Sequence, residues 1–571
     1  MEKRRQELWK FAAAWLLLAA PLFACPLVWL KTFRAHVPYW DEAVMFGPPA
    51  LALLAAAVLL SAGPSGIRRA CGNSRVSVSV VVAAAVLWLI SLLRDLFAGT
   101  ISDPAEWFVF LLPLAGMVLS REILRILPLY GTAVLAVLIF FTCRFSFFTG
   151  LPGNWNWNLS LLAVLIPAPF LYFFRISARR IWLPLLVPAV AAAAFSLFHP
   201  QLAPRGAMAG MLVASMAVWL LWKSSRRQRM MILFLGGGAG MVMFFSVWIG
   251  PAESAVRSSR VWLWRGSAEL ALTHSAVGVG MSGFERHINP HLPKEYYFSD
   301  FAVERHTHPH NELLAVWSGY GIVGAAFLSL LYLGASGGFR TGSAVRVWAF
   351  WMFLLLLVHG QFDVLLDIPL SGTLFWCVAG ALVGVPVRGG GVWRVAGAAG
   401  VLVTVIWAAM SFRAGVLARE SRFCSLAGDR VGARRNLERS LAVLPSPQAR
   451  YRAGMVALFD FKDPDEAIRH LEKLAPGYVH SNGYLARAYA VRGDRERALE
   501  YFARESVRYP MSALNAFWEL EVMKRGVCPP DELAGRRARL KYLLKLRRLS
   551  PERIGELIGN PALDDAPLST P

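Results

Sequence analysis

Long apolar stretches alternate with short polar connectors along the first 412 residues of the chain, which has 571 residues. Most stretches have about 16 to 22 residues, close to the length that a helix needs to cross the hydrocarbon core of a bilayer. The pattern predicts thirteen transmembrane helices, or twelve if the short fourth stretch does not cross, at 10–31, 43–62, 77–97, 105–120, 126–142, 158–174, 181–198, 206–222, 230–250, 312–333, 347–366, 369–386 and 394–412.

The sequence changes character near Phe412, because the remainder is charged and contains no stretch able to span a bilayer. The chain begins with the basic segment Met1-Glu-Lys-Arg-Arg and an apolar run through Leu30, which predicts an uncleaved first helix. We therefore expect an all-α protein with two domains, a polytopic membrane helical bundle at 1–412 and a soluble α-helical domain at 413–571. A composition of 56% hydrophobic and 17% charged residues agrees with a membrane protein.

The formal net charge of +22, from 59 basic and 37 acidic residues, raises the question of a nucleic-acid partner. Its distribution argues against one, because basic residues gather in alternate connectors, as they do on the cytoplasmic side of membrane proteins. These connectors contain Arg68, Arg69, Arg75, Arg121, Arg125, Arg175, Arg179, Arg180, Lys223, Arg226, Arg227, Arg229, Arg340, Arg346, Arg388 and Arg394. The asymmetry predicts a multi-pass protein of the bacterial inner membrane with a cytoplasmic N-terminus. It places a loop at about 251–311 and the tail in the periplasm.

The tail repeats a pair of apolar positions at intervals of 34 and then 31 residues. The pairs are Ala433 and Leu437, Ala467 and Leu471, and Ala498 and Phe502; Pro445, Pro476 and Pro510 follow them, and Gly428 and Gly493 precede two of them. This spacing resembles tetratricopeptide repeats, in which a small residue permits close helix crossing and proline ends the second helix. The alternative is an ordinary helical bundle.

Six cysteines occur without a regular spacing, at Cys25, Cys71, Cys143, Cys377, Cys424 and Cys528. Most fall in or beside predicted spans, so we interpret them as small apolar residues. A disulfide between Cys424 and Cys528 remains open if the tail is periplasmic, because pairing cannot be deduced from sequence.

The loop at about 251–311 holds most of the candidate chemistry. Its ionisable residues include Arg257, Arg260, Arg265, His274, His287, His291, Glu304, Arg305, His306, His308 and His310. The three histidines at alternate positions have the donor type of a zinc site, but Pro309 and the start of the next apolar stretch constrain them, so we expect no metal. Gly278-Val-Gly280 superficially matches a phosphate-binding fingerprint. No alternating strands and helices surround it, so we expect a close-packed loop.

Several motifs follow one another in and beside this loop. Arg260 is followed four residues later by Trp264, a Gly-x-Gly-x-x-x-Phe stretch ends at Phe284, and Thr307-His-Pro-His-Asn leads into an apolar stretch with a Gly-x-x-Gly pair. Arg205-Gly-Ala stands at an outer membrane boundary. In this order, over 205–324, the motifs resemble those of the O-antigen ligase and polymerase superfamily, although Pro204 stands where that superfamily usually has serine.

The resemblance implies a membrane fold of the lipid-carrier-dependent glycosyltransferase type and a donor glycan linked to undecaprenyl pyrophosphate. Such an enzyme needs cations to hold the diphosphate and a base for the acceptor hydroxyl. Arg260 and Arg205 are our candidates for the diphosphate, with Arg265 and Arg305 as further candidates, because guanidinium groups bind phosphate oxygens bidentately. The alternative for each is an arginine at the membrane edge with its charge in water.

His310 is our candidate for the general base, because a neutral imidazole accepts a proton near pH 7. His308 and Asn311 are candidates for substrate binding. Asn311 also suits a helix cap, His308 also suits the orientation of His310, and the two histidines are interchangeable at this stage. Asp363 and Asp367, near the outer end of a predicted span, either orient an arginine, contact the acceptor or have a hydrated structural role.

We expect a metal-independent, cofactor-independent, inverting glycosyltransferase of lipopolysaccharide biosynthesis. It would move a glycan from undecaprenyl pyrophosphate to a periplasmic acceptor such as lipid A core, with the tail binding the acceptor or an envelope protein. A polymerase and a protein O-oligosaccharyltransferase share the motifs and remain alternatives. A transporter is disfavoured, because its polar residues usually lie within the spans. A noncatalytic membrane scaffold would keep its function without His310.

Overall fold

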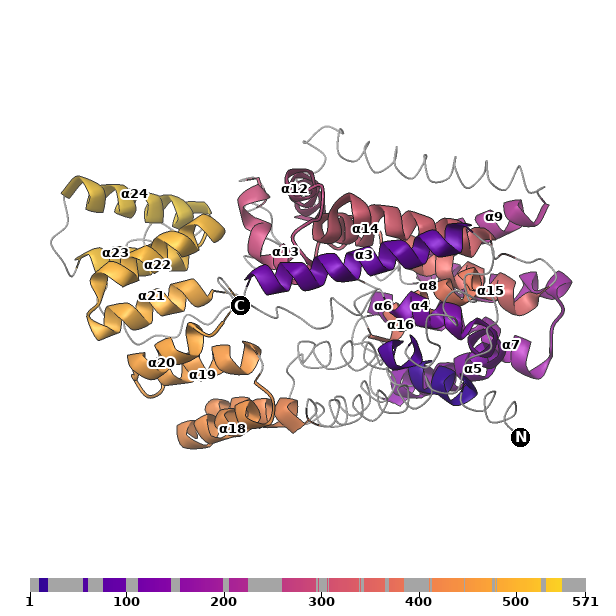
Figure 1. Cartoon of the computed structure of the whole chain (residues 1–571), viewed down its shortest axis with the longest axis horizontal. Helices are drawn as coiled ribbons and strands as arrows, with labels where there is room; N and C mark the ends of the chain where they lie inside the picture. The colour runs from indigo at the N-terminus through magenta and orange to yellow at the C-terminus, as the bar shows by residue number, and fades with distance from the viewer. Residues whose placement is uncertain are drawn as a thin grey trace. The chain divides into compact units, whose positions relative to one another are not determined.

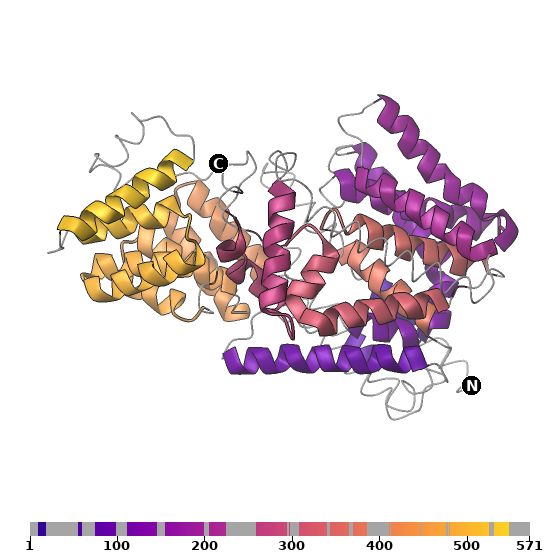
Figure 2. The same ribbon diagram turned by 90° about the horizontal axis from the view of Figure 1, so that it is seen from above.

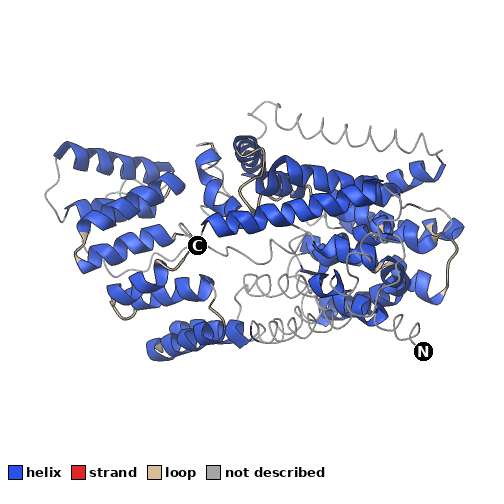
Figure 3. Cartoon of the chain, in the orientation of Figure 1, coloured by secondary structure: helices blue, strands red, loops and turns tan. Residues whose placement is uncertain are grey.

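The computed structural model describes residues 10–18, 55–59, 75–98, 111–144, 155–198, 205–223, 259–293, 296, 306, 308–337, 339, 343–364, 369–384, 410, 413–445, 447–474, 478, 480–524 and 530–546. Within these ranges the regular elements are helices and none is a strand (Figure 3). The all-helical class is therefore confirmed for the described residues. The chain divides into two compact units: Met1–Ile249 with Ala271–Ser282 and His308–Phe412, and Gly250–Leu270 with Gly283–Thr307 and Arg413–Pro571.

The first unit is a bundle of apolar helices around an aromatic centre. Its helices include α3 (Arg75–Ala98), α4 (Leu111–Val118), α5 (Ser120–Arg144), α6 (Trp155–Leu165), α7 (Pro167–Phe173), α8 (Trp182–Phe198), α9 (Arg205–Lys223), α14 (Glu312–Gly337), α15 (Ala344–His359) and α16 (Pro369–Val383). α15 packs against α9 and α16, and its side chains Trp348, Phe350, Trp351 and Phe353 are fully buried. α3 runs along α14 in both views (Figures 1 and 2).

Two helical stretches of this unit, Ser120–Ile139 and Glu312–Gly337, are long and apolar enough to cross a membrane. Shorter apolar helices occur at Arg75–Leu87, Leu159–Phe173, Gly206–Trp222, Ala344–His359 and Leu370–Val383. The predicted span at 230–250, nearly all of that at 394–412 and most of those at 10–31 and 43–62 lie outside the described residues. A membrane-helix character is thus supported, and the number of crossings stays a prediction.

Proline explains where one predicted span differs from the structure. The stretch predicted at 158–174 consists of α6 and α7, which meet at Ile166, directly before Pro167. Proline at a first helical position has no N–H to satisfy, so a new helix begins there at little cost. Pro128, by contrast, lies inside the continuous helix α5.

The second unit contains the tail, where consecutive helices pack against one another along the chain (Figure 1). After a helix at 413–426 come α18 (Arg430–Val443), α19 (Pro447–Phe459), α20 (Pro464–Leu471), α21 (Ser481–Arg492), α22 (Arg495–Arg508), α23 (Ala513–Lys524) and α24 (Pro530–Leu546). The recurring apolar pairs all fall on α18, α20 and α22, and all are buried.

An aspartate begins each of those three helices. Asp429, Asp463 and Asp494 are the N-caps of α18, α20 and α22, and each carboxylate accepts a hydrogen bond from the backbone N–H three residues on. Such a cap satisfies one of the N–H groups that lack an intrahelical partner. Gly428 and Gly493, which precede two of these aspartates, have φ of 79° and 91°, a region that favours glycine.

The same unit contains part of the predicted loop. α12 (Ser259–Thr273), α13 (Met281–His287) and a 3₁₀ turn, η3 (Asn289–His291), make up most of its described residues. Residues 271–282, which include the last turn of α12 and the start of α13, belong to the first unit.

Candidate active site

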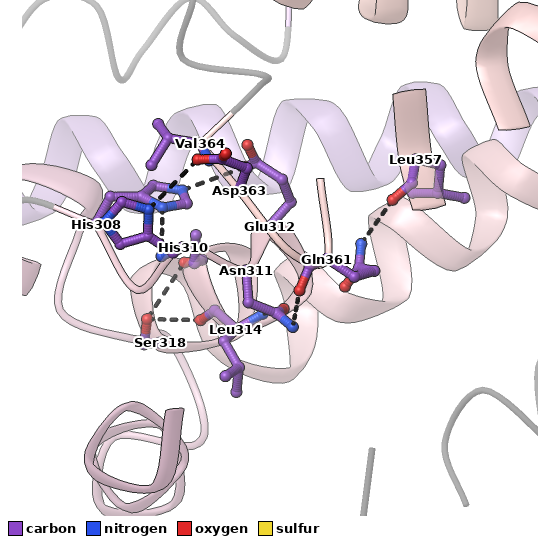
Figure 4. A network of polar contacts seen from close by, with 11 residues as sticks. His308, His310, Asn311, Glu312, Leu314, Ser318, Leu357, Gln361, Asp363 and Val364 are labelled. Carbon is purple, nitrogen blue, oxygen red and sulfur yellow. Dashed lines mark hydrogen bonds and ion pairs between the residues drawn. The ribbon is translucent and has the colours of Figure 1, made fainter. Parts of the chain in front are cut away.

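The segment His308–Glu312 forms a tight turn immediately before α14 (Figure 4). Pro309 disfavours the helical conformation for His308, and His310 has φ of 54°, a left-handed conformation that side chains rarely adopt. The backbone N–H of His310 donates to Nδ1 of His308 at 2.9 Å. This bond holds His310 in its unusual conformation.

His308 is committed to this turn. Because its Nδ1 accepts a hydrogen bond, the neutral ring carries its proton on Nε2. That nitrogen lies 3.4 Å from Oε2 of Glu312, and both side chains are only 3% exposed. We therefore interpret His308 as a residue that orients the turn.

Asn311 caps α14 and joins it to the end of α15. Its Oδ1 accepts from the N–H of Leu314 at 2.9 Å, and its Nδ2 donates to the carbonyl of Gln361 at 3.0 Å. The N–H of Glu312 donates to the carbonyl of Gly360 at 2.8 Å. A Cβ on Gly360 would lie 2.6 Å from Cγ of Glu312, so glycine permits this close approach.

Asp363 is placed beside His310 by these bonds. Its Oδ1 lies 3.5 Å from Nδ1 of His310 and accepts from the N–H of Val364 at 2.8 Å (Figure 4). The carboxylate is 6% exposed, whereas the His310 side chain is 39% exposed. A buried carboxylate beside one ring nitrogen favours the proton on that nitrogen, so the other nitrogen can accept one. This pair has the arrangement of a general base with an orienting acid.

Arg205 is the first residue of α9, and the next residue lies close to the same end of α15. A Cβ on Gly206 would lie 2.5 Å from Cδ2 of His359 and 3.5 Å from Cβ of Phe362, the neighbour of Asp363. The structure therefore brings the backbone of the Arg205-Gly motif close to the residues that follow α15, among them Asp363. The side chain of Arg205 lies outside the described part of the structure.

Arg260 and Arg265 lie on α12, in the second unit, and both are exposed. Arg260 is the second residue of α12, and its role in binding the diphosphate stays a prediction. Arg305, Glu304 and Asp367 lie outside the described residues.

His306 has a different partner from the other two histidines. Its Nε2 lies 2.6 Å from the Tyr296 hydroxyl, and the ring is buried. Among the described residues, no group of three or more histidine, cysteine or acidic side chains could hold a metal ion. Cys424 accepts a hydrogen bond from Asn436, and Cys528 lies outside the described residues.

The Gly278-Val-Gly280 motif has a structural role. Gly278 and Gly280 have φ of 65° and 85°, and α14 is interrupted at Gly321, with φ of 61°. The N–H groups of Val279 and Gly280 donate to the carbonyls of Ser318 and Gly319 at 2.9 and 2.8 Å. Because these N–H groups are already used within the fold, they are not available to bind a phosphate.

The sequence does not predict the role of Glu312 beside His308. For Asp363 it predicts an arginine partner, a contact with the acceptor or a hydrated structural role, and the structure instead places this carboxylate beside His310. Intramembrane acidic residues are a general signal of function, and that signal pointed to Asp363 without indicating its partner.

Residues 202–329 match the family model described as O-Antigen ligase. The match covers Arg205, α12, the glycine motif and the His308–Glu312 turn, and it supports a ligase- or polymerase-type membrane glycosyltransferase. No curated protein and no solved structure matches the chain.

Proposed function

We propose that this protein transfers a glycan from undecaprenyl pyrophosphate to a hydroxyl group of a periplasmic acceptor such as lipid A core. The observation that carries the proposal is the His310–Asp363 pair, in which His310 belongs to the segment similar to O-antigen ligases and Asp363 follows that segment in the sequence. A half-exposed imidazole beside a buried carboxylate suits proton abstraction from an alcohol.

The proposed reaction is a single displacement. His310 takes the proton of the acceptor hydroxyl on Nε2 while the acceptor oxygen attacks the anomeric carbon. The bond from that carbon to the diphosphate oxygen breaks, and its electron pair leaves with undecaprenyl diphosphate. Attack from the opposite side inverts the anomeric configuration, and Asp363 stabilises the imidazolium that forms, because the contact becomes an ion pair.

Cations stabilise the charge that develops on the leaving group. We propose Arg205 and Arg260 for this role, with Arg265 and Arg305 as further contacts, and no metal ion. The approach of Gly206 to His359 and Phe362 supports Arg205, because it puts this motif beside the turn that holds Asp363. Arg260 is supported by its position in the matched segment.

The proposed architecture has a multi-pass membrane domain at 1–412 and a tetratricopeptide-like domain at 413–571 in the periplasm. Buried alanines and capping aspartates that recur on alternate tail helices support the repeat assignment. A concave repeat surface suits the binding of an acceptor or an envelope protein.

The test is glycan transfer in proteoliposomes with an undecaprenyl-pyrophosphate-linked donor and lipid A core. We expect His310→Ala to lower the rate by about 100- to 10,000-fold, Arg260→Ala to lower it strongly, and chelator to have no effect. His274→Ala is the matched control, because His274 is an exposed histidine that lies outside the histidine turn and hydrogen-bonds to its neighbour Thr273.

Two further acceptors separate the alternatives. Lengthening of the lipid-linked donor without lipid A core would identify a polymerase, and transfer to a periplasmic protein would identify an oligosaccharyltransferase. Equal transfer by wild type and His310→Ala would contradict the proposed mechanism.

A further inference from the structure

One hydrogen bond connects the tail to a segment more than two hundred residues earlier. Nε of Arg508, the last residue of α22, donates to the carbonyl of Arg286 in the last turn of α13 at 3.0 Å. Carbonyls at the end of a helix have no intrahelical partner and carry the negative end of the helix dipole. A guanidinium group at this position both satisfies the carbonyl and complements the dipole.

The contact is built into the fold of the second unit. Burial lowers the pKa of Arg508, an effect that nearby Tyr509 and Glu505 only partly offset. α22 also packs against η3, which follows α13. Arg508 is half-buried, and a guanidinium group that is partly removed from water is costly unless its donors are satisfied, so the bond to the Arg286 carbonyl offsets part of this cost.

The 3₁₀ turn η3 and the residue after it also contact α12. A Cβ on Gly266 would lie 2.9 Å from Cδ2 of Leu292 and 3.0 Å from the carbonyl of His291. Nδ1 of His291 lies 3.5 Å from Oε1 of Glu269, also on α12. The end of α13 and η3 thus lie between the tail and the helix that carries Arg260 and Arg265.

We propose that the tail positions α12 through α13 and η3, with Arg508 as the positioning residue. The tail would then hold the arginines of α12 in place for the diphosphate, in addition to any partner that it binds. This inference rests on the proposed function, because Arg260 matters for transfer only if it binds the donor.

The experiment uses the full-length protein in proteoliposomes and two readouts. Hydrogen exchange reports on the amides of residues 283–292 and of α12, and initial rates give KM separately for the lipid-linked donor and the acceptor. The variants are Arg508→Ala, Arg508→Lys and Gly266→Ala. Arg504→Ala is the control, because Arg504 lies one turn earlier on α22, is exposed and pairs only with its helix neighbour Glu500 among the ion pairs described.

We expect Arg508→Ala to speed exchange at 283–292 and to raise the donor KM by about 3- to 30-fold, with the acceptor KM unchanged. Arg508→Lys should raise the donor KM less than Arg508→Ala does, because lysine keeps a cation near the end of α13. Gly266→Ala should give the same pattern without touching the tail, since it separates α12 from η3. The double variant Arg508→Ala with Gly266→Ala should raise the donor KM by less than the product of the two single effects. Both substitutions disrupt the same series of contacts between α22 and α12.

The inference is overturned if Arg508→Ala leaves exchange at 283–292 like that of Arg504→Ala. It is also overturned if exchange rises while the donor KM stays unchanged. If wild type transfers no glycan, the proposed function fails, and exchange then decides alone whether Arg508 holds α13, η3 and α12 together.

Discussion

His310 combines a left-handed backbone with a partly exposed ring, and its neighbours account for both. The hydrogen bond to His308 fixes the backbone, and Asp363 lies on one side of the ring. Residues in rarely occupied conformations cost about 1–3 kcal/mol and persist where the surroundings hold them. The turn thus aims one ring nitrogen at Asp363 and leaves the other edge of the ring accessible.

Asp363→Asn should lower glycan transfer by about tenfold or more. The amide can still accept from the N–H of Val364, but it no longer stabilises a protonated His310. The same proteoliposome assay measures the effect. Ser329→Ala is the control, because Ser329 is exposed on α14 and bonds to the carbonyl of Ala325 in its own helix. Full activity of Asp363→Asn would show that His310 works without this carboxylate.

A second residue-level prediction concerns pH and His470 in the tail. Burial lowers the pKa of His470 below its ordinary value of 6.5, and Glu466 offsets only part of this effect. His470 therefore binds a proton more tightly in the unfolded chain than in the folded protein. The stabilising contribution is fully present above pH 6.5 and is lost as the pH falls through the lowered folded-state pKa.

We therefore expect faster hydrogen exchange of α20 amides, corrected for the intrinsic rate, as the pH falls from about 7 to about 5. His470→Gln should reduce this dependence, while His274→Gln, outside the tail, should not. Identical pH profiles for His470→Gln and wild type would exclude His470 as the source.

At the scale of elements, the glycine motif and α14 exchange backbone hydrogen bonds. The interruption at Gly321 frees the N–H of Ile322 from its helix, and this N–H donates to the carbonyl of Ser275 at 2.8 Å. The carbonyl of Ser318 in turn accepts from Val279. The helix therefore tolerates the break because the loop supplies the missing partners.

Gly278→Ala should destabilise the first unit by about 1–3 kcal/mol. The new Cβ would require a positive φ and would collide with the backbone of Gly319. Thermal unfolding in detergent provides the measurement. The control is Gly337→Ala at the end of α14, where nothing lies within 4 Å of the new Cβ, so this variant should change the stability little. Equal midpoints for the two variants would contradict this role of Gly278.

The elements differ in how far the sequence predicts them. The cap by Asn311 and the buried alanines of α18, α20 and α22 follow from local spacing, and the structure contains both. The pairing of His310 with Asp363 does not, because it depends on how the start of α14 meets the end of α15. Such a contact is set by tertiary packing, which a single sequence does not display.

At the scale of the whole molecule, the contact of Arg508 with Arg286 requires that the tail and the loop lie on one side of the membrane. The number of crossings between residues 311 and 413 must then be even. α14, α15 and α16, together with the predicted span at 394–412, would make four.

Cysteine labelling tests this requirement. In a chain with its native cysteines replaced, Val277→Cys in the loop and Val507→Cys on α22 are both exposed positions. We expect a membrane-impermeant maleimide to label both from the periplasmic side of intact cells. Arg180→Cys, in a connector predicted to be cytoplasmic, should be labelled only after the membrane is opened. Labelling of one of the first two positions without the other would contradict the shared side.

The second unit is assembled from three separate stretches of the chain, and this has a consequence for biogenesis. During synthesis, α12, α13 and η3 are made long before the tail, because α14, α15 and α16 lie between them in the sequence. Segments that fold together wait for the last of them. A nascent chain that already contains every residue of the histidine turn thus still lacks the tail, and with it the contact of Arg508 with the Arg286 carbonyl. If the tail positions α12 as proposed, the arginines of α12 reach their final positions only after the tail has been made.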